Sequence, residues 1–362
     1  MGRLQRCIVP SLLGLVGLVG CAGLTPPPRQ IFDTSPIAAT DLSAPLRLSA
    51  GAEDDEDPAV VRAADGTFHV VWAAKDASGQ VDLFVRSSRD GRSWSAPVRI
   101  TSSPDADYYP ALAQTRDGTL HLTWFRLQRK AGRMNIWYAQ SRDGRRWSRP
   151  IAITERDGID WAPAIYEDTE RVLWILWSSD RTRSRELFGV RSGDGGRSWS
   201  RAYQLTDSPE EDDFPHVLDV RGERVLVWTR FRPGSPLRSF HKDASAEVVR
   251  ATSRDGIHWS EPVPCTPADP GNRYVEMLPF MFTDSAQGRA YVSWTSNRSD
   301  KSGDILMEEL APASAPIRQL TTSNRSDYGA KIVPTGRPDE YLMVWVSTRD
   351  GKADIFVRLF RL

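Results

Sequence analysis

Residues 68–94 read FHVVWAAKDASGQVDLFVRSSRDGRSW, and this stretch decides the fold of the 362-residue chain. An apolar run ends just after Trp72, a polar loop follows, and a second apolar run leads into a Ser-x-Asp-Gly turn that ends in Trp94. Short apolar runs bounded by turn residues are typical of β-strands. The stretch therefore predicts two adjacent strands joined by a hairpin.

The same unit recurs six times along the chain. Its tryptophan is Trp72, Trp124, Trp177, Trp228, Trp294 or Trp345, at spacings of 52, 53, 51, 66 and 51 residues. Each unit opens with a strand after Pro58 or its equivalent and closes with a short strand like Pro97–Thr101. Four strands per unit predict an all-β, six-bladed β-propeller with four-stranded blades over residues 44–362.

The two ends of the repeat predict how the ring closes. The sixth unit stops at Leu362 after its third strand, while residues 45–49 (PLRLS) match residues 97–101 (PVRIT). The N-terminal strand therefore completes the last blade. Closure removes the exposed sheet edges that promote aggregation.

Composition excludes several classes of protein. With 13 Trp, 25 Pro and 26 Gly, the chain is rich in residues of short strands and tight turns, which argues against an all-helical fold. The 47 basic and 47 acidic residues balance, so no nucleic-acid partner is expected. No Walker loop or dinucleotide motif occurs, and the five histidines are scattered, so we expect no cofactor. The protein is also expected to be a monomer.

The N-terminus resembles a bacterial lipoprotein signal. Residues 1–20 carry Arg3 and Arg6 before an apolar stretch, and Leu18-Val19-Gly20-Cys21 resembles the lipobox. The resemblance implies lipidation of Cys21 and anchoring in the cell envelope, and Ala22 after it points to the outer membrane. The alternative is an ordinary secretory signal with an incidental cysteine. Residues 21–43, with three consecutive prolines, are expected to form a tether.

Four turns resemble the Asp boxes of the sialidase family. They follow the third strand of blades one to four, and their acidic residues are Asp90, Asp143, Asp194 and Asp255. The Asp accepts backbone N–H groups of its own turn, so these residues are expected to be structural. The resemblance implies a sialidase-like six-bladed propeller. The segments after the other strands, such as Trp177–Arg181, resemble TolB-type propeller repeats.

A carboxylate stands three residues before the proline position in every blade. These residues are Asp55, Asp107, Asp160, Asp212, Glu276 and Asp327. Arginines follow the second strand of most blades: Arg126, Arg181, Arg230, Arg298 and Arg349. Both sets are expected at the mouth of the central channel. One hypothesis is a binding face, on which the ring of carboxylates binds a cation such as calcium or a basic peptide segment and the arginines bind anionic groups. The other is that each carboxylate caps its turn and pairs with an arginine of a neighbouring blade.

The sialidase resemblance implies three arginines for a substrate carboxylate, a tyrosine nucleophile assisted by a glutamate, and an aspartate acid/base. Candidates for part of this set are Asp76, Tyr328 and Arg230. Tyr328 is aligned with Tyr109, Trp161 and Phe214, and the sequence offers no glutamate partner for it. Glu56 stands where the family carries its first arginine, and it would repel a substrate carboxylate.

These observations favour a lipid-anchored envelope propeller that binds a protein or glycan partner without chemistry. The alternative is an exo-acting, sialidase-like glycosidase that uses the channel-mouth face. The longest insertion, residues 230–247, is expected to recognise the partner, unless it is a disordered excursion.

Overall fold

The computed structural model describes residues 40–49, 51, 53–232, 245–266, 274–298, 303–311 and 317–362. The predicted signal at residues 1–20, Cys21 and residues 22–39 of the tether lie outside the described residues, as do residues 233–244 of the blade-four insertion. Within the described part, no helix is long and apolar enough to cross a membrane.

The described residues form six antiparallel sheets, and we number them as blades one to six in chain order. Blades one to three contain β3 (Asp55–Arg62), β4 (Phe68–Lys75), β5 (Val81–Ser88) and β6 (Val98–Arg99); β7 (Ala106–Gln114), β8 (Leu120–Gln128), β9 (Arg133–Ser141) and β10 (Ile151–Ala152); and β11 (Asp160–Glu167), β12 (Leu173–Ser179), β13 (Glu186–Ser192) and β14 (Tyr203–Gln204). Blades four to six contain β15 (Glu211–Val220), β16 (Glu223–Phe231), β17 (Ala246–Ser253) and β18 (Val263–Pro264); β19 (Glu276–Asp284), β20 (Arg289–Ser296), β21 (Asp304–Ala311) and β22 (Arg318–Gln319); and β23 (Asp327–Pro334), β24 (Glu340–Ser347) and β25 (Asp354–Arg361).

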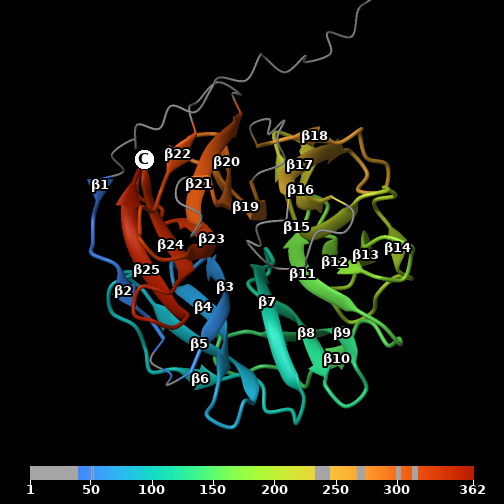
Figure 1. Ribbon diagram of the computed structural model, residues 1–362, viewed down its shortest axis with the longest axis horizontal. Coiled ribbons are helices and arrows are strands. Elements are labelled where there is room, and N and C mark those ends of the chain that lie inside the picture. Colours follow the sequence, from blue (N-terminus) through green and yellow to red (C-terminus); the bar gives the residue numbers. More distant parts are fainter. Residues whose placement is uncertain are drawn as a thin grey trace, which may run out of the picture.

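The blades are arranged as a propeller ring. The first strand of each blade, β3, β7, β11, β15, β19 or β23, lies toward the centre, and the later strands lie progressively outward (Figure 1). The six tryptophans that define the repeat are buried between blades, and Trp124 and Trp177 are 0% exposed. The predicted all-β, six-bladed fold is therefore confirmed.

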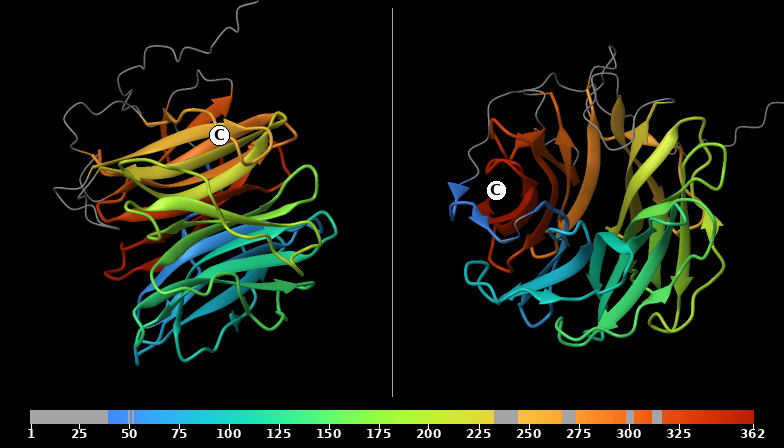
Figure 2. Two further views of the ribbon diagram at one scale, coloured as in Figure 1. Left: turned by 90° about the vertical axis from the view of Figure 1, so that its right-hand side faces the viewer. Right: turned by 60° about the horizontal axis from the view of Figure 1, so that its bottom comes forward.

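Two N-terminal strands complete blade six. β1 (Thr40–Asp41) and β2 (Leu46–Arg47) both pair with β25, and they lie beside it at the outer edge of the ring (Figure 2). The closing strand was predicted at residues 45–49. The additional pairing of β1 falls within the range expected for the tether, so the sheet begins earlier than the sequence indicated.

A hydroxyl group after the outermost strand shows that this closure repeats the chemistry of the other blades. In blade one, Thr101 Oγ1 accepts a hydrogen bond from the backbone N–H of Leu83 at 3.0 Å. In blade six, Ser49 Oγ accepts one from Ile355 N–H at 2.9 Å. Ser49 therefore does for the last blade what Thr101 does for the first.

A β-bulge interrupts the inner strand of every blade. The register between inner and second strands shifts at the proline position in all six sheets. The residue before that position has a positive φ in each blade: Asp57, Tyr109, Ala162, Phe214, Leu278 and Gly329. Five of the six are not glycine, and a left-handed backbone at such residues costs about 1–2 kcal/mol each. Strained backbone of this kind is concentrated at functional sites.

Candidate functional site at the channel mouth

The channel mouth is the face of the ring where the inner strands begin and the second strands end. The six predicted carboxylates lie here, at the first or second residue of their inner strands. All six are buried, and none is more than 2% exposed. A buried carboxylate is stable only when a cation or hydrogen-bond donors compensate its charge.

Arginines of the same blade provide this compensation in five blades. Arg126 binds Asp107 through two parallel hydrogen bonds of 2.7 and 3.0 Å, and Arg230 binds Asp212 at 2.8 and 3.0 Å. The remaining pairs are Arg181–Asp160, Arg298–Glu276 and Arg349–Asp327. The sequence-based hypothesis placed each partner on a neighbouring blade. The structure places it on the same blade; in blade two, for example, Asp107 and Arg126 stand opposite each other in the register of two adjacent strands.

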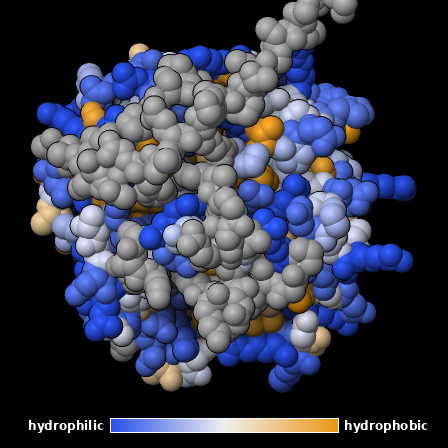
Figure 3. Space-filling model, turned by 45° about the horizontal axis from the view of Figure 1, so that its top comes forward, coloured by the Kyte–Doolittle hydropathy of each residue, from blue (hydrophilic) through white to orange (hydrophobic). Residues whose placement is uncertain are grey.

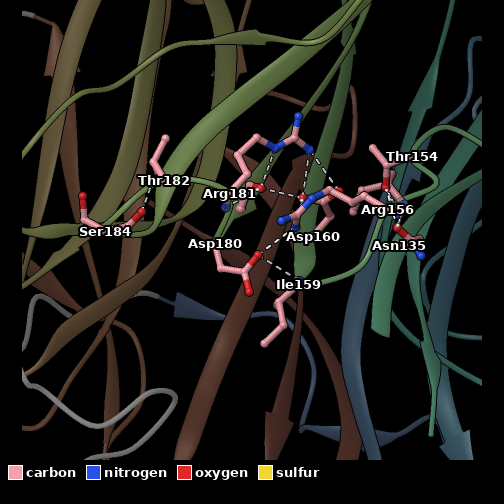
Figure 4. Close-up of polar contacts among 11 residues, drawn as sticks. Asn135, Thr154, Arg156, Ile159, Asp160, Asp180, Arg181, Thr182 and Ser184 are labelled. Atoms are coloured by element: carbon pink, nitrogen blue, oxygen red, sulfur yellow. Dashed lines mark hydrogen bonds and ion pairs between the residues drawn. The ribbon is translucent and has the colours of Figure 1, made fainter. Parts of the chain in front are cut away.

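Blade three shows how closely these groups are tied together. Arg181 Nη2 lies 3.0 Å from both carboxylate oxygens of Asp160, and Arg156 connects Asp180 at 2.7 Å to the same cluster (Figure 4). The Arg181 guanidinium also lies over the ring of Phe188, 4.4 Å from its centroid. The predicted arginines are thus bound by protein groups, which limits the charge and hydrogen-bond donors that they can provide to an anionic ligand.

Blade one departs from this pattern. Asp55 stands opposite Ala74, so this blade has no arginine at the equivalent position. Burial raises the pKa of Asp55, and the nearby Lys352 acts in the opposite direction. Among the described residues, no group of three or more His, Cys, Asp or Glu is arranged to hold a metal ion.

A cavity of about 280 Å³ opens at the channel mouth beside these pairs. Residues of five blades line it: Glu56, Asp57, Pro58, Tyr109, Pro110, Phe214, Met277, Leu278, Ser326, Tyr328, Gly329, Lys331, Val346 and Thr348. Five of the six positive-φ residues are in this set. The bulges therefore form much of the cavity wall, and this role explains why the strained backbone is present in the inner strands.

Tyr328 and Glu56 meet in this cavity. The Tyr328 hydroxyl lies 3.2 Å from Glu56 Oε1 and donates a hydrogen bond to it. Burial raises the pKa of Tyr328, and the carboxylates of Glu56, Asp57 and Asp54 raise it further. The sequence offered no glutamate partner for this tyrosine. That expectation was wrong, because ring closure brings blade six against blade one although the two residues are 272 positions apart.

The bulge register also corrects the alignment of Tyr328. Tyr328, Trp161 and Tyr108 are each the last paired residue before the bulge. Tyr109 and Phe214 instead occupy the next position, with positive φ. The sequence therefore treated two different structural positions as equivalent. The position directly before the proline contributes to the cavity lining in five blades, and the position before that contributes in three.

Lys331 is the basic residue of the cavity lining. Its amine lies 5.1 Å from the centroid of the Phe280 ring. Burial lowers the pKa of Lys331 to about 8, while the Asp57 carboxylate opposes this shift. Behind it, burial lowers the pKa of His216 to about 3, so His216 is neutral and accepts a hydrogen bond from Met281 N–H at 3.3 Å. Neither Lys331 nor His216 was a sequence candidate for the site.

The lowered pKa of Lys331 predicts a pH-dependent stability. Between about pH 8 and pH 10.5, the unfolded chain holds a proton on this amine that the folded protein has lost, so folding becomes more favourable as pH rises. Compared with Lys331→Met, the wild-type protein should gain on the order of 1–3 kcal/mol of unfolding free energy across this window. Urea titrations of both proteins at several pH values measure the difference. A difference that is constant or falls with pH would contradict the shift.

The other two members of the sialidase-like set lie outside the cavity lining. Asp76 is in the exposed turn after β4, where it accepts hydrogen bonds from the backbone N–H groups of Ser78 and Gln80. Arg230 is bound to Asp212. Of the three candidates, the structure places only Tyr328 in the cavity lining.

The Asp boxes lie on the opposite face of the ring, after the third strands. Asp90 Oδ1 accepts hydrogen bonds from the backbone N–H groups of Arg92 and Ser93 at 2.8 and 2.7 Å. These bonds lower the pKa of Asp90 to about 2. The same backbone bonds recur at Asp143, Asp194 and Asp255. Their role in this structure is to hold turns.

No protein-family model and no curated protein sequence matches this chain. Solved structures that are similar to it include a protein of unknown function from Dyadobacter fermentans, with 14% identity, a TM-score of 0.72, and coverage of 90% of this chain and 98% of the other.

Two glycosidases are also similar in structure. The α-L-arabinofuranosidase Arb93A of Fusarium graminearum has 16% identity, a TM-score of 0.65, and coverage of 85% of this chain and 93% of the other. The NanB sialidase of Streptococcus pneumoniae has 9% identity, a TM-score of 0.64, and coverage of 87% and 69%. At these identities the likeness concerns the fold alone, so this chain has a sialidase-like six-bladed propeller of the kind that glycosidases use.

Proposed function

We propose that the chain is a glycan-binding propeller of the bacterial cell envelope, which holds one sugar unit in the channel-mouth cavity without hydrolysing it. Lipidation of Cys21 would anchor the monomeric protein in the outer membrane. The observation that carries the binding proposal is the cavity itself. Its 280 Å³ is below the roughly 300–1,000 Å³ of pockets for drug-sized ligands, a size suited to a single sugar.

The lining has the chemistry that sugars require. Tyr109, Phe214 and Leu278 provide apolar surface for the carbon face of a sugar ring. Glu56, Tyr328 and Lys331 provide acceptors and donors for its hydroxyl groups. Apart from the segments drawn in grey, the surface seen in Figure 3 is mainly hydrophilic, with hydrophobic residues scattered over it. A small mixed cavity on such a surface supports a polar ligand with an apolar face.

The positions of the carboxylates argue against hydrolysis. Glycosidases of the common types place two carboxyl groups on either side of the scissile bond, about 5–9.5 Å apart. Among the described residues that line this cavity, the carboxylates are Glu56 and Asp57, which are adjacent on β3. One strand therefore provides both, and no carboxylate of the described lining faces them from another blade.

A second candidate function rests on the Tyr328–Glu56 hydrogen bond. Sialidases, which this fold resembles, use a tyrosine nucleophile assisted by a glutamate, and the pair has that composition. On this alternative the protein would be an exo-acting glycosidase. No arginine is present in the described lining to bind a sialic acid carboxylate, so the substrate would be a different sugar.

Assays of the full chain separate the two functions. We expect binding of a monosaccharide by calorimetry and no turnover on a panel of chromogenic glycosides that includes a sialoside and an arabinofuranoside. Tyr328→Phe should weaken binding about three- to tenfold, because it removes one hydrogen-bonding hydroxyl from the cavity. The matched control is Tyr108→Phe, which changes the equivalent position of blade two outside the cavity lining.

Two results would decide against the proposal. Turnover that Tyr328→Phe abolishes and Tyr108→Phe preserves would establish the glycosidase. Absence of both binding and turnover across the panel would remove the cavity as a glycan site.

A further inference from the structure

One position in the inner strands differs in size around the ring. It is the first residue that pairs with the second strand after the bulge, and in blades one to six it is Ala59, Ala111, Ala164, His216, Phe280 and Lys331. Three blades therefore carry a methyl group here, and one blade carries an amine. A feature that the propeller architecture requires would recur in every blade. The lysine is specific to blade six, where it lines the channel-mouth cavity.

The three large side chains of this position lie against one another. The rings of His216 and Phe280 have centroids 4.3 Å apart, and the Lys331 amine lies 5.1 Å from the Phe280 centroid. No hydrogen bond or ion pair joins Lys331 to another described residue, although the Asp57 carboxylate acts on its amine electrostatically. Part of the Lys331 side chain is accessible. The amine is therefore positioned beside an aromatic ring and available to a ligand in the cavity.

The other described lysines have different surroundings. The chain contains six lysines among its 47 basic residues. Lys75 and Lys130 are exposed, and the Lys352 amine donates hydrogen bonds to two backbone carbonyl groups. Water and carbonyl oxygens both stabilise a protonated amine. Within the described part of the chain, Lys331 is thus the lysine whose amine lines a cavity without such donors' partners.

The uncharged form of the Lys331 amine is well populated. Burial lowers the pKa of Lys331 to about 8, against the opposing effect of Asp57. At about pH 7.5, roughly a quarter of such amines are neutral, compared with about one in a thousand for a lysine of ordinary pKa. The neighbouring His216, whose pKa burial lowers to about 3, is neutral at this pH. A desolvated, neutral lysine amine is a nucleophile that forms Schiff bases with carbonyl compounds.

We propose that Lys331 captures a small aldehyde in the channel-mouth cavity as a Schiff base. The volume of about 280 Å³ limits the ligand to a short chain, and the hydroxyl groups of Tyr328 and Ser326 in the lining can hydrogen-bond to a polar one. The ligand class is therefore a hydroxyaldehyde, either a short one or a reducing sugar in its open-chain form. This activity goes beyond the proposed glycan binding and does not depend on it.

The reaction needs no oxidant, reductant or cofactor. The lone pair of the Lys331 nitrogen forms a bond to the aldehyde carbon, and the electron pair of the carbonyl π bond moves to the oxygen. One proton passes from nitrogen to oxygen and gives a carbinolamine. The second nitrogen proton then leaves with the hydroxyl group as water, and the C=N bond forms. One amine and one aldehyde thus give one imine and one water, and hydrolysis reverses the reaction.

Reductive trapping of the folded full chain tests the proposal. Glycolaldehyde is added with sodium cyanoborohydride at about pH 7.5, and the reductant transfers hydride to the imine carbon to leave a stable secondary amine. Peptide mass spectrometry then compares the rate of labelling at Lys331 with the rates at Lys75 and Lys130. Lys331 should be labelled at least tenfold faster, because its neutral fraction is about a hundredfold larger. In concentrated urea this preference should disappear.

Two variants and two further aldehydes sharpen the test. Lys331→Arg keeps the positive charge and should remove the fast phase of labelling, whereas the matched control Lys75→Arg should preserve it. Dextran carrying aldehyde groups is too large for the cavity, so it should label Lys75 and Lys130 but not Lys331. Arabinose in place of glycolaldehyde identifies the source of the aldehyde: fast labelling by both reagents indicates a reducing sugar, and fast labelling by glycolaldehyde alone indicates a short hydroxyaldehyde.

Three results would overturn the proposal: equal labelling rates at Lys331, Lys75 and Lys130 with both small aldehydes, a preference for Lys331 that persists in urea, or fast labelling of Lys331 by the dextran aldehyde. The outcome is separable from that of the glycan proposal. Fast labelling without binding of any intact sugar would retain the Schiff base and remove the glycan site, and sugar binding without fast labelling would do the reverse.

Discussion

Gly196→Ala should destabilise the propeller by about 2–5 kcal/mol. Gly196 is the glycine of the third Asp box and has a φ of +85°, where an alanine costs about 1–2 kcal/mol. A Cβ at this position would also lie 2.1 Å from the hydroxyl oxygen of Tyr138 in blade two. Tyr138 is buried and hydrogen-bonded to His121 at 2.6 Å, so making room for the methyl group costs a further 1–3 kcal/mol, roughly.

The neighbouring glycine provides the control. Gly195 has a φ of +74° and a Cβ there would contact nothing within 4 Å. Gly195→Ala should therefore cost only the backbone strain, about 1–2 kcal/mol. Urea denaturation of the two variants measures the difference. Equal losses would mean that packing between blades two and three at the Asp box does not contribute to stability.

Arg126→Met should be comparably severe, with a loss of about 3–5 kcal/mol. The substitution leaves the carboxylate of Asp107, which is 0% exposed, without its bidentate partner. The Arg126 side chain also lies over the Trp137 ring at 4.2 Å, a contact that methionine retains in part. The loss therefore reports mainly the uncompensated charge.

An exposed ion pair on the opposite face is the matched control. The side chains of Arg142 and Asp117 are 71% and 59% exposed, so Arg142→Met should cost less than about 1 kcal/mol. Combining Arg126→Met with Asp107→Leu should recover much of the lost stability, because it replaces the whole buried pair by apolar groups. If Arg126→Met is as mild as Arg142→Met, the channel-mouth arginines are not structural and become available to a ligand.

The fold could be predicted from the sequence because its determinants are local and repeated. Trp72 and its five equivalents fix the period, and Ser49 matches Thr101 closely enough to identify the closing strand. Each blade repeats the same short-range hydrogen bonds, so one unit explains the others. The Asp-box turns were predictable for the same reason.

The cavity could not be predicted in this way. It is built from residues of five blades, and its central contact joins Glu56 of blade one to Tyr328 of blade six, which become neighbours only when the ring closes. A repeat alignment compares equivalent positions and does not show which residues of different blades meet. The pairing of Asp107 with Arg126 was more accessible to prediction, because the two residues lie on adjacent strands whose register follows from the hairpin.

The most direct test of the glycan-binding claim is a set of crystal structures of the full chain, each soaked with a different neutral monosaccharide. The account predicts density for an intact sugar in the channel-mouth cavity, packed against the rings of Tyr109 and Phe214 and in contact with Glu56. A sugar bound only elsewhere, such as among the Asp-box turns around Asp143 and Asp194, or an empty channel-mouth cavity at saturating sugar, would contradict it.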